Sequence, residues 1–379
     1  MAYQLVCIQC GQKQDTSRYV LHCDGCGGLL DTKYDAPATS DARVVKGMRG
    51  TARYLPTLPI NSPQNLVTMG EGNTPIVPLS RIGHELDLEV HGKLEYFNPT
   101  CSFKDRGNAV QVSVLKEVGI TEVADITGGN GGHSFAAYCA RAGIKYHGFP
   151  VKEGASERKV EAIGFYGTQM HWVDGDRVTA AAEVEKFSAD SGISRMRYAQ
   201  GIYFIEGQKT MAYEIAEQMD TLPDHIIVPV GNGSILQGLW KGFQDMLEDG
   251  RVKRIPKLYG AQTKETRPVA DAFEGRNWNP YEGDAASVAS GIGVKEPPRV
   301  EALLKALRES GGRPVTVDEE SIIAWQRRLA ELEGIFVEPT SAIVIGAAQE
   351  LKRTGVIKGG ETLLLPFTGF GMKEPLPQD

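Results

Sequence analysis

The sequence predicts an α/β protein built on parallel sheets, because short apolar segments alternate with amphipathic helical segments from about residue 85 onward. Strands that alternate with helices along a chain form parallel sheets covered by helices. Three glycine-rich turns, at 127–132, 231–234 and 368–371, each follow a predicted strand directly. Ligands of open parallel sheets bind beyond the carboxyl ends of the strands, so these turns are candidates for one ligand crevice.

The individual elements follow from the spacing of apolar residues and from stop signals such as Gly143. Strands are predicted at Val123–Ile126, Ile144–Val151, Gln169–Val173, His225–Val230, Lys257–Gln262 and Thr362–Phe367. Helices are predicted at His133–Ala142, Arg177–Ala189, Glu206–Met219, Ile235–Leu247, Glu319–Leu332 and Ser341–Leu351.

The composition excludes several classes of protein. Of the 379 residues, 41% are hydrophobic and 23% charged, which excludes a disordered or fibrous chain. The length suggests two to three domains. The net charge is −7 and no basic stripe is present, so neither nucleic acid nor an anionic membrane is expected as the main partner. No run of 18 apolar residues and no secretory signal is visible, and we expect a cytoplasmic protein.

Four of the six cysteines lie in the first 26 residues, as Cys7-x2-Cys10 and Cys23-x2-Cys26. Two such pairs can place four thiolates around one Zn²⁺, and a site closed by four thiolates is structural. The alternative is four thiols that bind no metal. Residues 1–35 are therefore predicted to form a zinc-ribbon module. Such clustering is unlike a disulfide framework and agrees with a reducing compartment.

Two further segments carry chemistry. Asn98–Gly107 reads Asn-Pro-Thr-Cys-Ser-Phe-Lys-Asp-Arg-Gly and places Lys104 in a turn that enters a helix. A lysine amine can bond covalently to an aldehyde, although a lone lysine is more often a surface charge. Gly231-Asn232-Gly233-Ser234 follows a strand and opens a helix, where backbone amides can hold a phosphate. It matches neither a Walker loop nor a dinucleotide fingerprint.

Taken together, these segments resemble the threonine synthase family of pyridoxal-phosphate enzymes. Asn98–Gly107 is similar to the family's cofactor-lysine segment, the zinc-ribbon pattern occurs in some members, and other matching stretches cover nearly the whole chain in the family's order. These stretches are Gly70–Pro75, Glu206–Thr210, Gly231–Ile235, Glu333–Pro339 and Thr368–Pro375.

The resemblance implies the type II fold of the tryptophan synthase β superfamily, with two open, mostly parallel sheet domains that carry helices on both faces. With the N-terminal zinc ribbon at 1–35, it implies a large cofactor-binding domain at 36–84 plus 196–379. It also implies a small mobile domain at 85–195 that carries the asparagine loop. A homodimer is the family expectation.

The resemblance assigns a role to each matching residue. Lys104 would bind pyridoxal phosphate covalently and act as acid and base on the substrate carbons. Phe103 would pack near the ring, Asn130 would hydrogen-bond the phenolic oxygen, and Thr368 would meet the pyridine nitrogen, which a neutral hydroxyl leaves unprotonated. The cofactor phosphate would lie against Gly231, Asn232, Gly233 and Ser234. The substrate carboxylate would lie against the loop residues Thr127, Gly128, Gly129, Asn130 and Gly131.

The substrate side departs from the family pattern. Phe204 stands where the family has an arginine that helps hold the phosphate of O-phosphohomoserine, and losing one charged hydrogen bond costs about 1.5–3 kcal/mol. Arg141, Arg177 or Lys209 are candidates to compensate. The other departures are Ala199 for serine, Gly201 for asparagine, Gly128 and Gly131 for hydroxyl residues, Phe370 for histidine and Cys101 for glycine.

Two residues near the predicted site have open roles. His133 is either a new acid or base for the substrate or a helix N-terminal residue in ordinary contacts. Cys101 is either a small packing residue or a thiol near the cofactor. The segment Ser287–Lys295 resembles the corresponding segment of threonine dehydratases.

The sequence thus predicts a pyridoxal-phosphate-dependent carbon–oxygen lyase of amino-acid biosynthesis, which acts on a small amino acid by β or γ elimination or replacement. The altered pocket predicts a substrate that is less anionic, bulkier or more apolar than O-phosphohomoserine. Alternatives are an ordinary threonine synthase, which converts O-phosphohomoserine and water to threonine and phosphate, and a serine/threonine dehydratase-like ammonia lyase. A catalytically silent zinc-ribbon binding protein is a further alternative, against which Lys104, Asn130 and the phosphate loop argue.

Overall fold

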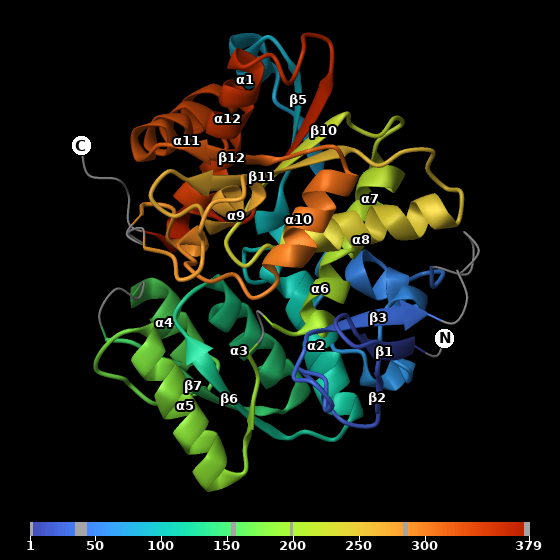
Figure 1. The fold of residues 1–379 in the computed structure, drawn as a ribbon, viewed down its shortest axis with the longest axis vertical. Coiled ribbons are helices and arrows are strands. Elements are labelled where there is room, and N and C mark those ends of the chain that lie inside the picture. The colour runs from blue at the N-terminus through green and yellow to red at the C-terminus, as the bar shows by residue number, and fades with distance from the viewer. Residues whose placement is uncertain (1–2, 35–43, 153–156, 198–199, 283–286, 375–379) are drawn as a thin grey trace. The chain divides into compact units, whose positions relative to one another are not determined.

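The computed structural model describes residues 3–34, 44–152, 157–197, 200–282 and 287–374 (Figure 1). The contacts within the chain form two compact units. Unit 1 comprises Met1–Gly72, Asn98–Thr100 and Lys104–Gly207, and unit 2 comprises Asn73–Phe97, Cys101–Phe103 and Gln208–Asp379.

Unit 2 contains a six-stranded sheet in the order β12-β11-β10-β13-β5-β4, in which only β4 is antiparallel to its neighbour. Parallel strands β10 and β13 pair directly, so the turns that follow them leave the same edge of the sheet. The strands are β4 Ile76–Pro78, β5 Glu89–Lys93, β10 His225–Pro229, β11 Lys257–Thr263, β12 Pro314–Val317 and β13 Thr362–Pro366.

Helices cover both faces of this sheet, as Figure 1 shows, with α1, α11 and α12 on one face and α8, α9 and α10 on the other. Its central strands β10 and β13 are buried along nearly their whole length, as parallel strands covered on both faces are. Leu79 and Phe367 belong to one large apolar cluster of this unit. The helices are α1 Ser80–Leu86, α7 Thr210–Gln218, α8 Ser234–Glu248, α9 Pro268–Phe273, α10 Val300–Glu309, α11 Glu319–Glu333 and α12 Pro339–Arg353, with 3-10 turns η4 Glu95–Phe97, η5 Ser290–Ile292 and η6 Gly371–Lys373.

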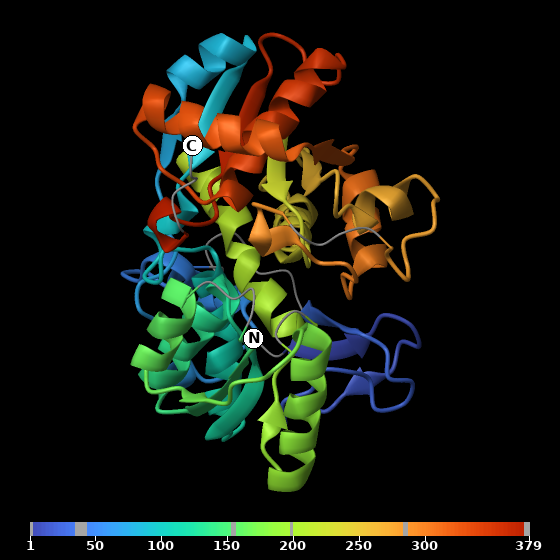
Figure 2. The same cartoon turned by 90° about the vertical axis from the view of Figure 1, so that its left-hand side faces the viewer.

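Unit 1 contains a four-stranded parallel sheet in the order β8-β7-β6-β9. Helix α3 packs on one face together with α2 and α4, and α5 packs on the other face (Figure 2). The elements are α2 Lys104–Glu117, β6 Glu122–Thr127, α3 Asn130–Ala142, β7 Lys145–Pro150, α4 Glu157–Phe165, β8 Gln169–Met170, α5 Arg177–Ser191, β9 Ser194–Arg195 and α6 Ile202–Gln208, with 3-10 turns η2 Gly50–Thr57 and η3 Pro63–Asn65.

The N-terminal part of unit 1 is a small antiparallel sheet in the order β2-β1-β3, formed by β1 Tyr3–Cys7, β2 Lys13–Gln14 and β3 Leu30–Tyr34. It does not stand on a core of its own. Its buried Tyr3 and Leu5 share one apolar cluster with Val110 of α2 and with Tyr203 and Ile205 of α6. This small sheet, which we call the N-terminal module, therefore packs on the helices that carry Lys104 and Phe204.

The predicted parallel α/β architecture is confirmed in both units, and each predicted strand is present, often shortened at its end. The predicted single helix Glu206–Met219 is wrong, because two helices meet there: α6 ends at Gln208 and α7 begins at Thr210. The break falls at Lys209, whose buried ammonium lies 3.3 Å from Asp245 Oδ2 on α8. This tertiary ion pair is invisible to helical periodicity.

The contact-based units differ from the domain division expected from the sequence. The segment 85–97 was expected in the small domain, but its strand β5 pairs with β13 in the sheet of unit 2. The segments 44–72 and 200–207 were expected in the large domain, but they belong to unit 1. The functional division into a large cofactor domain and a small mobile domain stays a prediction. No helix in the described ranges combines the length and apolar character that crossing a bilayer requires.

Candidate functional site

Lys104 is the first residue of α2 and is half-buried. The following residue, Asp105, is fully buried and fixes the start of this helix. Its carboxylate accepts hydrogen bonds from Thr100 N at 2.6 Å, from Thr100 Oγ1 at 2.5 Å and from Ser134 Oγ of α3 at 2.6 Å. A carboxylate in the first turn also interacts favourably with the helix dipole. The lysine therefore projects from a helix start that is tied to both the preceding loop and α3.

Phe204 of α6 forms an apolar wall beside the lysine, since Lys104 Nζ lies 5.6 Å from the centre of its ring. The ring can lie there because α2 has a glycine one turn on: a Cβ on Gly107 would be 2.5 Å from Phe204 Cδ2. A Cβ on Gly207 would likewise be 2.0 Å from the Arg106 carbonyl oxygen. The two helices thus cross at two glycines, which brings the α6 backbone directly against the first turn of α2.

The asparagine loop of unit 1 follows β6 and leads into α3. Helix α3 begins at Asn130, earlier than predicted, so Asn130 and Gly131 belong to its first turn. Its N-cap is Gly129, and no side chain caps the first-turn amides, which leaves them available to an anion such as a carboxylate. Gly128 has φ +146, a conformation that favours glycine. The hydroxyl residue that the family usually has here would be strained.

The same loop is joined to α2, because Asn108 Nδ2 donates to the Gly131 carbonyl at 3.3 Å. Thr127 ends β6, and its buried Oγ1 has no hydrogen-bond partner among the described residues. A buried hydroxyl in this state is suited to a bound polar group. Unit 1 therefore brings together Lys104, Phe204 and the predicted carboxylate-binding loop.

His133 lies in the first turn of α3, is half-buried and stacks on Tyr166 with 5.6 Å between ring centres. This contact is compatible with either of its predicted roles. Further along α3, Tyr138 donates to the carboxylate of Glu71 at 2.7 Å, and Thr68 Oγ1 and Met69 N donate to it as well. Burial raises the pKa of Glu71 to about 7 despite these donors.

In unit 2, the predicted phosphate loop follows β10 and leads into α8. Gly233 is the N-cap of α8 with φ +76, and it offers no side chain to cap the amides of the first turn. A Cβ on Gly233 would be 2.3 Å from Leu303 Cδ2, and one on Gly231 would be 3.0 Å from the Cα of Ile292. The loop is thus pressed against α10 and η5. A helix N-terminus with uncapped amides and closely packed glycines has the form of a phosphate site.

The turn after β13 carries Thr368, which is buried and held by backbone hydrogen bonds. The Thr368 carbonyl accepts from Phe103 N at 3.1 Å, and Phe370 N donates to the Cys101 carbonyl at 3.2 Å. Cys101 has φ +57, in the left-handed region, which explains why the family usually has glycine there. Phe370 packs on Tyr96 with 5.6 Å between ring centres. Unit 2 therefore brings together Phe103, Thr368 and the phosphate loop.

None of the candidate cations replaces the missing arginine in an evident way. Lys209 is paired with Asp245 in the core of unit 2. Arg141 is exposed near the end of α3, so about 16 Å of helix separates it from Asn130. Arg177 is exposed at the start of α5. Ala199, at the family's serine position, lies outside the described residues.

Two parts of this arrangement were missed by sequence reasoning. Ser341, on α12, holds the Thr368 turn through its hydroxyl oxygen. The recognised stretch Glu333–Pro339 ends only two residues before it, and extending that stretch would have found it. The other part is Glu206 of α6, which accepts from Thr32 Oγ1 at 2.5 Å and from Tyr34 OH at 2.6 Å, both in the N-terminal module.

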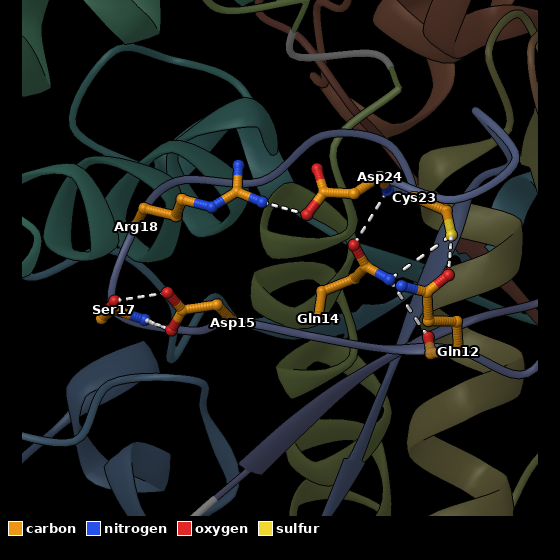
Figure 3. Close-up of polar contacts among 7 residues, drawn as sticks. All are labelled: Gln12, Gln14, Asp15, Ser17, Arg18, Cys23 and Asp24. Atoms are coloured by element: carbon orange, nitrogen blue, oxygen red, sulfur yellow. Dashed lines mark hydrogen bonds and ion pairs between the residues drawn. The ribbon is translucent and has the colours of Figure 1, made fainter.

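The four cysteines of the N-terminal module come together as the sequence predicts. Their sulfur atoms all lie within 4.8 Å of one another, with Cys7–Cys26 and Cys10–Cys26 at 3.5 Å and Cys10–Cys23 at 3.6 Å. Gly11 and Gly27 follow the two pairs with φ near +70, as tight turns require. Figure 3 shows Gln12 and Gln14 converging on Cys23, whose sulfur accepts from Gln14 Nε2 at 3.4 Å.

Comparison with known proteins adds three findings. Residues 67–369 match the family described as pyridoxal-phosphate dependent enzyme. The threonine synthase of Methanocaldococcus jannaschii is 34% identical over 97% of this chain and 92% of the relative, and that of Methanosarcina acetivorans is 33% identical over 98% and 93%.

Among solved structures, maize serine racemase matches with a TM-score of 0.68 and 20% identity, over 78% of this chain and 89% of that chain. Threonine deaminase isoform 2 from Solanum lycopersicum matches with a TM-score of 0.68 and 19% identity, over 81% and 80%. At these identities the structures establish the shared fold.

Proposed function

Because the chain belongs to the pyridoxal-phosphate-dependent enzymes and is similar to threonine synthases, we propose that it eliminates or replaces a β or γ substituent of a small amino acid. Its substrate, in this proposal, has a leaving group less anionic than the phosphate of O-phosphohomoserine. The observation that carries the proposal is the buried Phe204 ring, 5.6 Å from Lys104 Nζ. An arginine would supply a charged bidentate donor at position 204, whereas the phenyl ring supplies an apolar wall.

In unit 1, Lys104 would hold the cofactor covalently, and its Nζ would move protons at the substrate carbons. The first-turn amides of α3 and the hydroxyl of Thr127 would hold the substrate carboxylate, and Asn130 would hydrogen-bond the phenolic oxygen of the cofactor. Bound pyridoxal phosphate supplies an electron-withdrawing ring that stabilises negative charge at the substrate α carbon. The ring of Phe204, 5.6 Å from Lys104 Nζ, would shield the lysine from water.

In unit 2, the loop 231–234 and the first-turn amides of α8 would hold the cofactor phosphate. Thr368 would donate a hydrogen bond to the pyridine nitrogen, and Phe103 would pack near the ring. The fit is supported by the absence of a side-chain cap on α8 and by the buried hydroxyl of Thr368. Phosphate at a helix N-terminus gains from both the free amides and the helix dipole.

The cysteine cluster is proposed as a structural Zn²⁺ site. Thiolates about 2.3 Å from a tetrahedral Zn²⁺ lie roughly 3.8 Å from one another. The sulfur separations of 3.5 to 3.6 Å are close to this value. Four protein ligands leave no open position, so the metal would hold β1 and β3 of the module together. Metal analysis of the purified protein, with a Cys10→Ser and Cys26→Ser double variant as control, tests the site.

A substrate panel with product identification tests the proposed chemistry. O-phosphohomoserine, threonine, serine, O-acetylserine, O-phosphoserine and apolar analogues would be compared at equal concentration. We expect turnover of an uncharged or apolar substrate to exceed that of O-phosphohomoserine by at least about tenfold, since the arginine is absent and one charged hydrogen bond is worth about that factor or more. Robust release of threonine and phosphate from O-phosphohomoserine would instead establish an ordinary threonine synthase. That second candidate is favoured by the relatives at 33–34% identity.

The visible absorbance of the purified protein tests cofactor binding independently of substrate. We expect a yellow protein whose colour is lost in Lys104→Ala and retained in Lys116→Ala, a lysine in the last turn of the same helix. A colourless wild type would support the silent zinc-ribbon binding protein. A homodimer is proposed from the family resemblance, and sedimentation equilibrium of the coloured protein tests it.

A further inference from the structure

We propose that Ser341 is a positioning residue that donates to the Thr368 hydroxyl and so leaves the Thr368 proton available for the cofactor. This inference rests on the proposed function, because the acceptor it serves is the unprotonated pyridine nitrogen of the cofactor. It follows from counting the hydrogen bonds around a single oxygen atom.

The Ser341 hydroxyl lies at the centre of a buried group of polar atoms in unit 2. Ser341 is the third residue of α12 and is fully buried, and Thr368 is 3% exposed. Ser341 Oγ lies 3.0 Å from Thr368 N, 2.9 Å from Gly369 N and 2.9 Å from Thr368 Oγ1. The Gly369 carbonyl is farther away, at 3.4 Å.

The direction of each of these bonds is fixed by chemistry. Backbone N–H groups can only donate, so the amides of Thr368 and Gly369 occupy both lone pairs of Ser341 Oγ. The oxygen cannot accept a third bond, and its own proton must therefore point outward. Of its two acceptors, Thr368 Oγ1 at 2.9 Å is within the ordinary range for O–H donors, whereas the Gly369 carbonyl at 3.4 Å is beyond it.

Thr368 Oγ1 consequently accepts from Ser341 and keeps its own proton for another acceptor. The turn cannot rotate to escape this arrangement, because the Thr368 carbonyl accepts from Phe103 N and the Gly369 carbonyl accepts from Glu338 N, both at 3.1 Å. With that bond made, Thr368 Oγ1 still has its proton and one lone pair, and the proton can be donated to a neutral pyridine nitrogen. The pair Ser341–Thr368 thereby favours the unprotonated ring.

A double-mutant cycle on cofactor binding tests this role. The affinity of the apoprotein for pyridoxal 5'-phosphate is measured by absorbance in wild type, Ser341→Ala, Thr368→Val and the double variant. We expect Ser341→Ala to weaken binding by roughly tenfold, as one buried hydrogen bond warrants. In the Thr368→Val background the same substitution should have a smaller effect, limited to the loss of the two bonds that Ser341 accepts from the Thr368 and Gly369 amides.

A spectroscopic readout separates this role from simple stabilisation of the turn. The nitrogen-15 chemical shift of ring-labelled cofactor should report an unprotonated nitrogen in wild type and a shift toward the protonated value in Ser341→Ala. Ser310→Ala is the matched control. Ser310 is also a buried serine of unit 2 that accepts from a backbone amide, Leu258 N, and its loss should leave the nitrogen signal unchanged. If Ser341→Ala does not fold, Ser341→Cys is used instead, because cysteine has a similar shape and a weaker hydrogen-bond donor. The nitrogen-15 chemical shift should then move in the same direction by a smaller amount.

The outcomes distinguish this inference from the proposed function. An unchanged nitrogen signal in a folded Ser341 variant, or an equal loss of affinity with and without the Thr368 hydroxyl, would overturn the role of Ser341 alone. A wild-type protein that binds no cofactor would overturn the proposed function and this role together.

Discussion

Two helices with a glycine N-cap, α8 in unit 2 and α3 in unit 1, begin in the same way but differ in how tightly that glycine is enclosed. The N-cap of α8, Gly233, has a left-handed backbone, and a Cβ there would be 2.3 Å from Leu303. The N-cap of α3, Gly129, is extended, and a Cβ there would meet nothing within 4 Å.

This difference corresponds to the two proposed tasks. The predicted phosphate loop is held by close packing that leaves no room for a side chain at Gly233. Such a rigid site suits a ligand group that is always the same, here the cofactor phosphate. The predicted substrate loop has open space at Gly129 and carries two of the departures from the family pattern, Gly128 and Gly131. Changes in substrate preference should therefore be tolerated better around Gly129 than around the predicted phosphate loop.

The strongest test of this contrast is a pair of matched substitutions. Gly233→Ala adds left-handed strain and an overlap with Leu303, which together should cost about 4 kcal/mol of stability and abolish most cofactor binding. Gly129→Ala should cost at most about 1 kcal/mol, the difference between glycine and alanine at an N-cap. Urea unfolding and cofactor titration measure both effects, and equal losses would refute the contrast.

The buried carboxyl of Glu71 should make the stability of unit 1 depend on pH. Its pKa in the folded state is raised to about 7 by burial, so folding binds a proton that the unfolded chain releases above about pH 4.5. Stability should therefore fall by about 3 kcal/mol as pH rises from about 4.5 to about 7, and should not change further above that. Urea unfolding at several pH values compares wild type with Glu71→Gln. A parallel decline in both would assign the effect to other groups.

The link between the N-terminal module and α6 should contribute a smaller amount. Tyr34→Phe removes one hydrogen bond to the buried Glu206 carboxylate and should cost about 2 kcal/mol. Because Phe204 lies on the same helix, the variant should also speed amide hydrogen exchange in 202–208. Ser17→Ala, which removes an exposed hydroxyl of the same module, is the control. Unchanged exchange in α6 would show that the module does not hold this helix.

The smallest effect is expected at Cys101, the strained residue of unit 2. Cys101→Gly should raise stability by up to about 1 kcal/mol, because glycine adopts its φ of +57 without steric cost. Cys101→Ala keeps the strain and should not stabilise. Thermal unfolding of both variants separates the backbone from the thiol, and equal stabilisation by alanine would show that φ is not the cause.

Local pattern was sufficient for the parallel α/β architecture, the strand positions and the cluster of four cysteines. These depend on periodicity and on short spacings that each segment carries itself. The helical pattern of 206–219 continues across Lys209, so it indicates neither the break there nor the ion pair that Lys209 forms with Asp245 in another helix. The same limit applies to the candidate site: motifs predict Lys104 and Thr368, whereas Ser341 and Glu206 hydrogen-bond partners that are distant in sequence.

The crossing of α2 and α6 at Gly107 and Gly207 has a consequence for how such an enzyme evolves. With no side chain between the two backbones, α6 cannot shift relative to the lysine helix without opening a void or a clash. The position of residue 204 is thus inherited with the scaffold, and only its identity is free to vary. A substitution at this single position can therefore place a charged or an apolar side chain beside Lys104 while the surrounding backbone keeps its position.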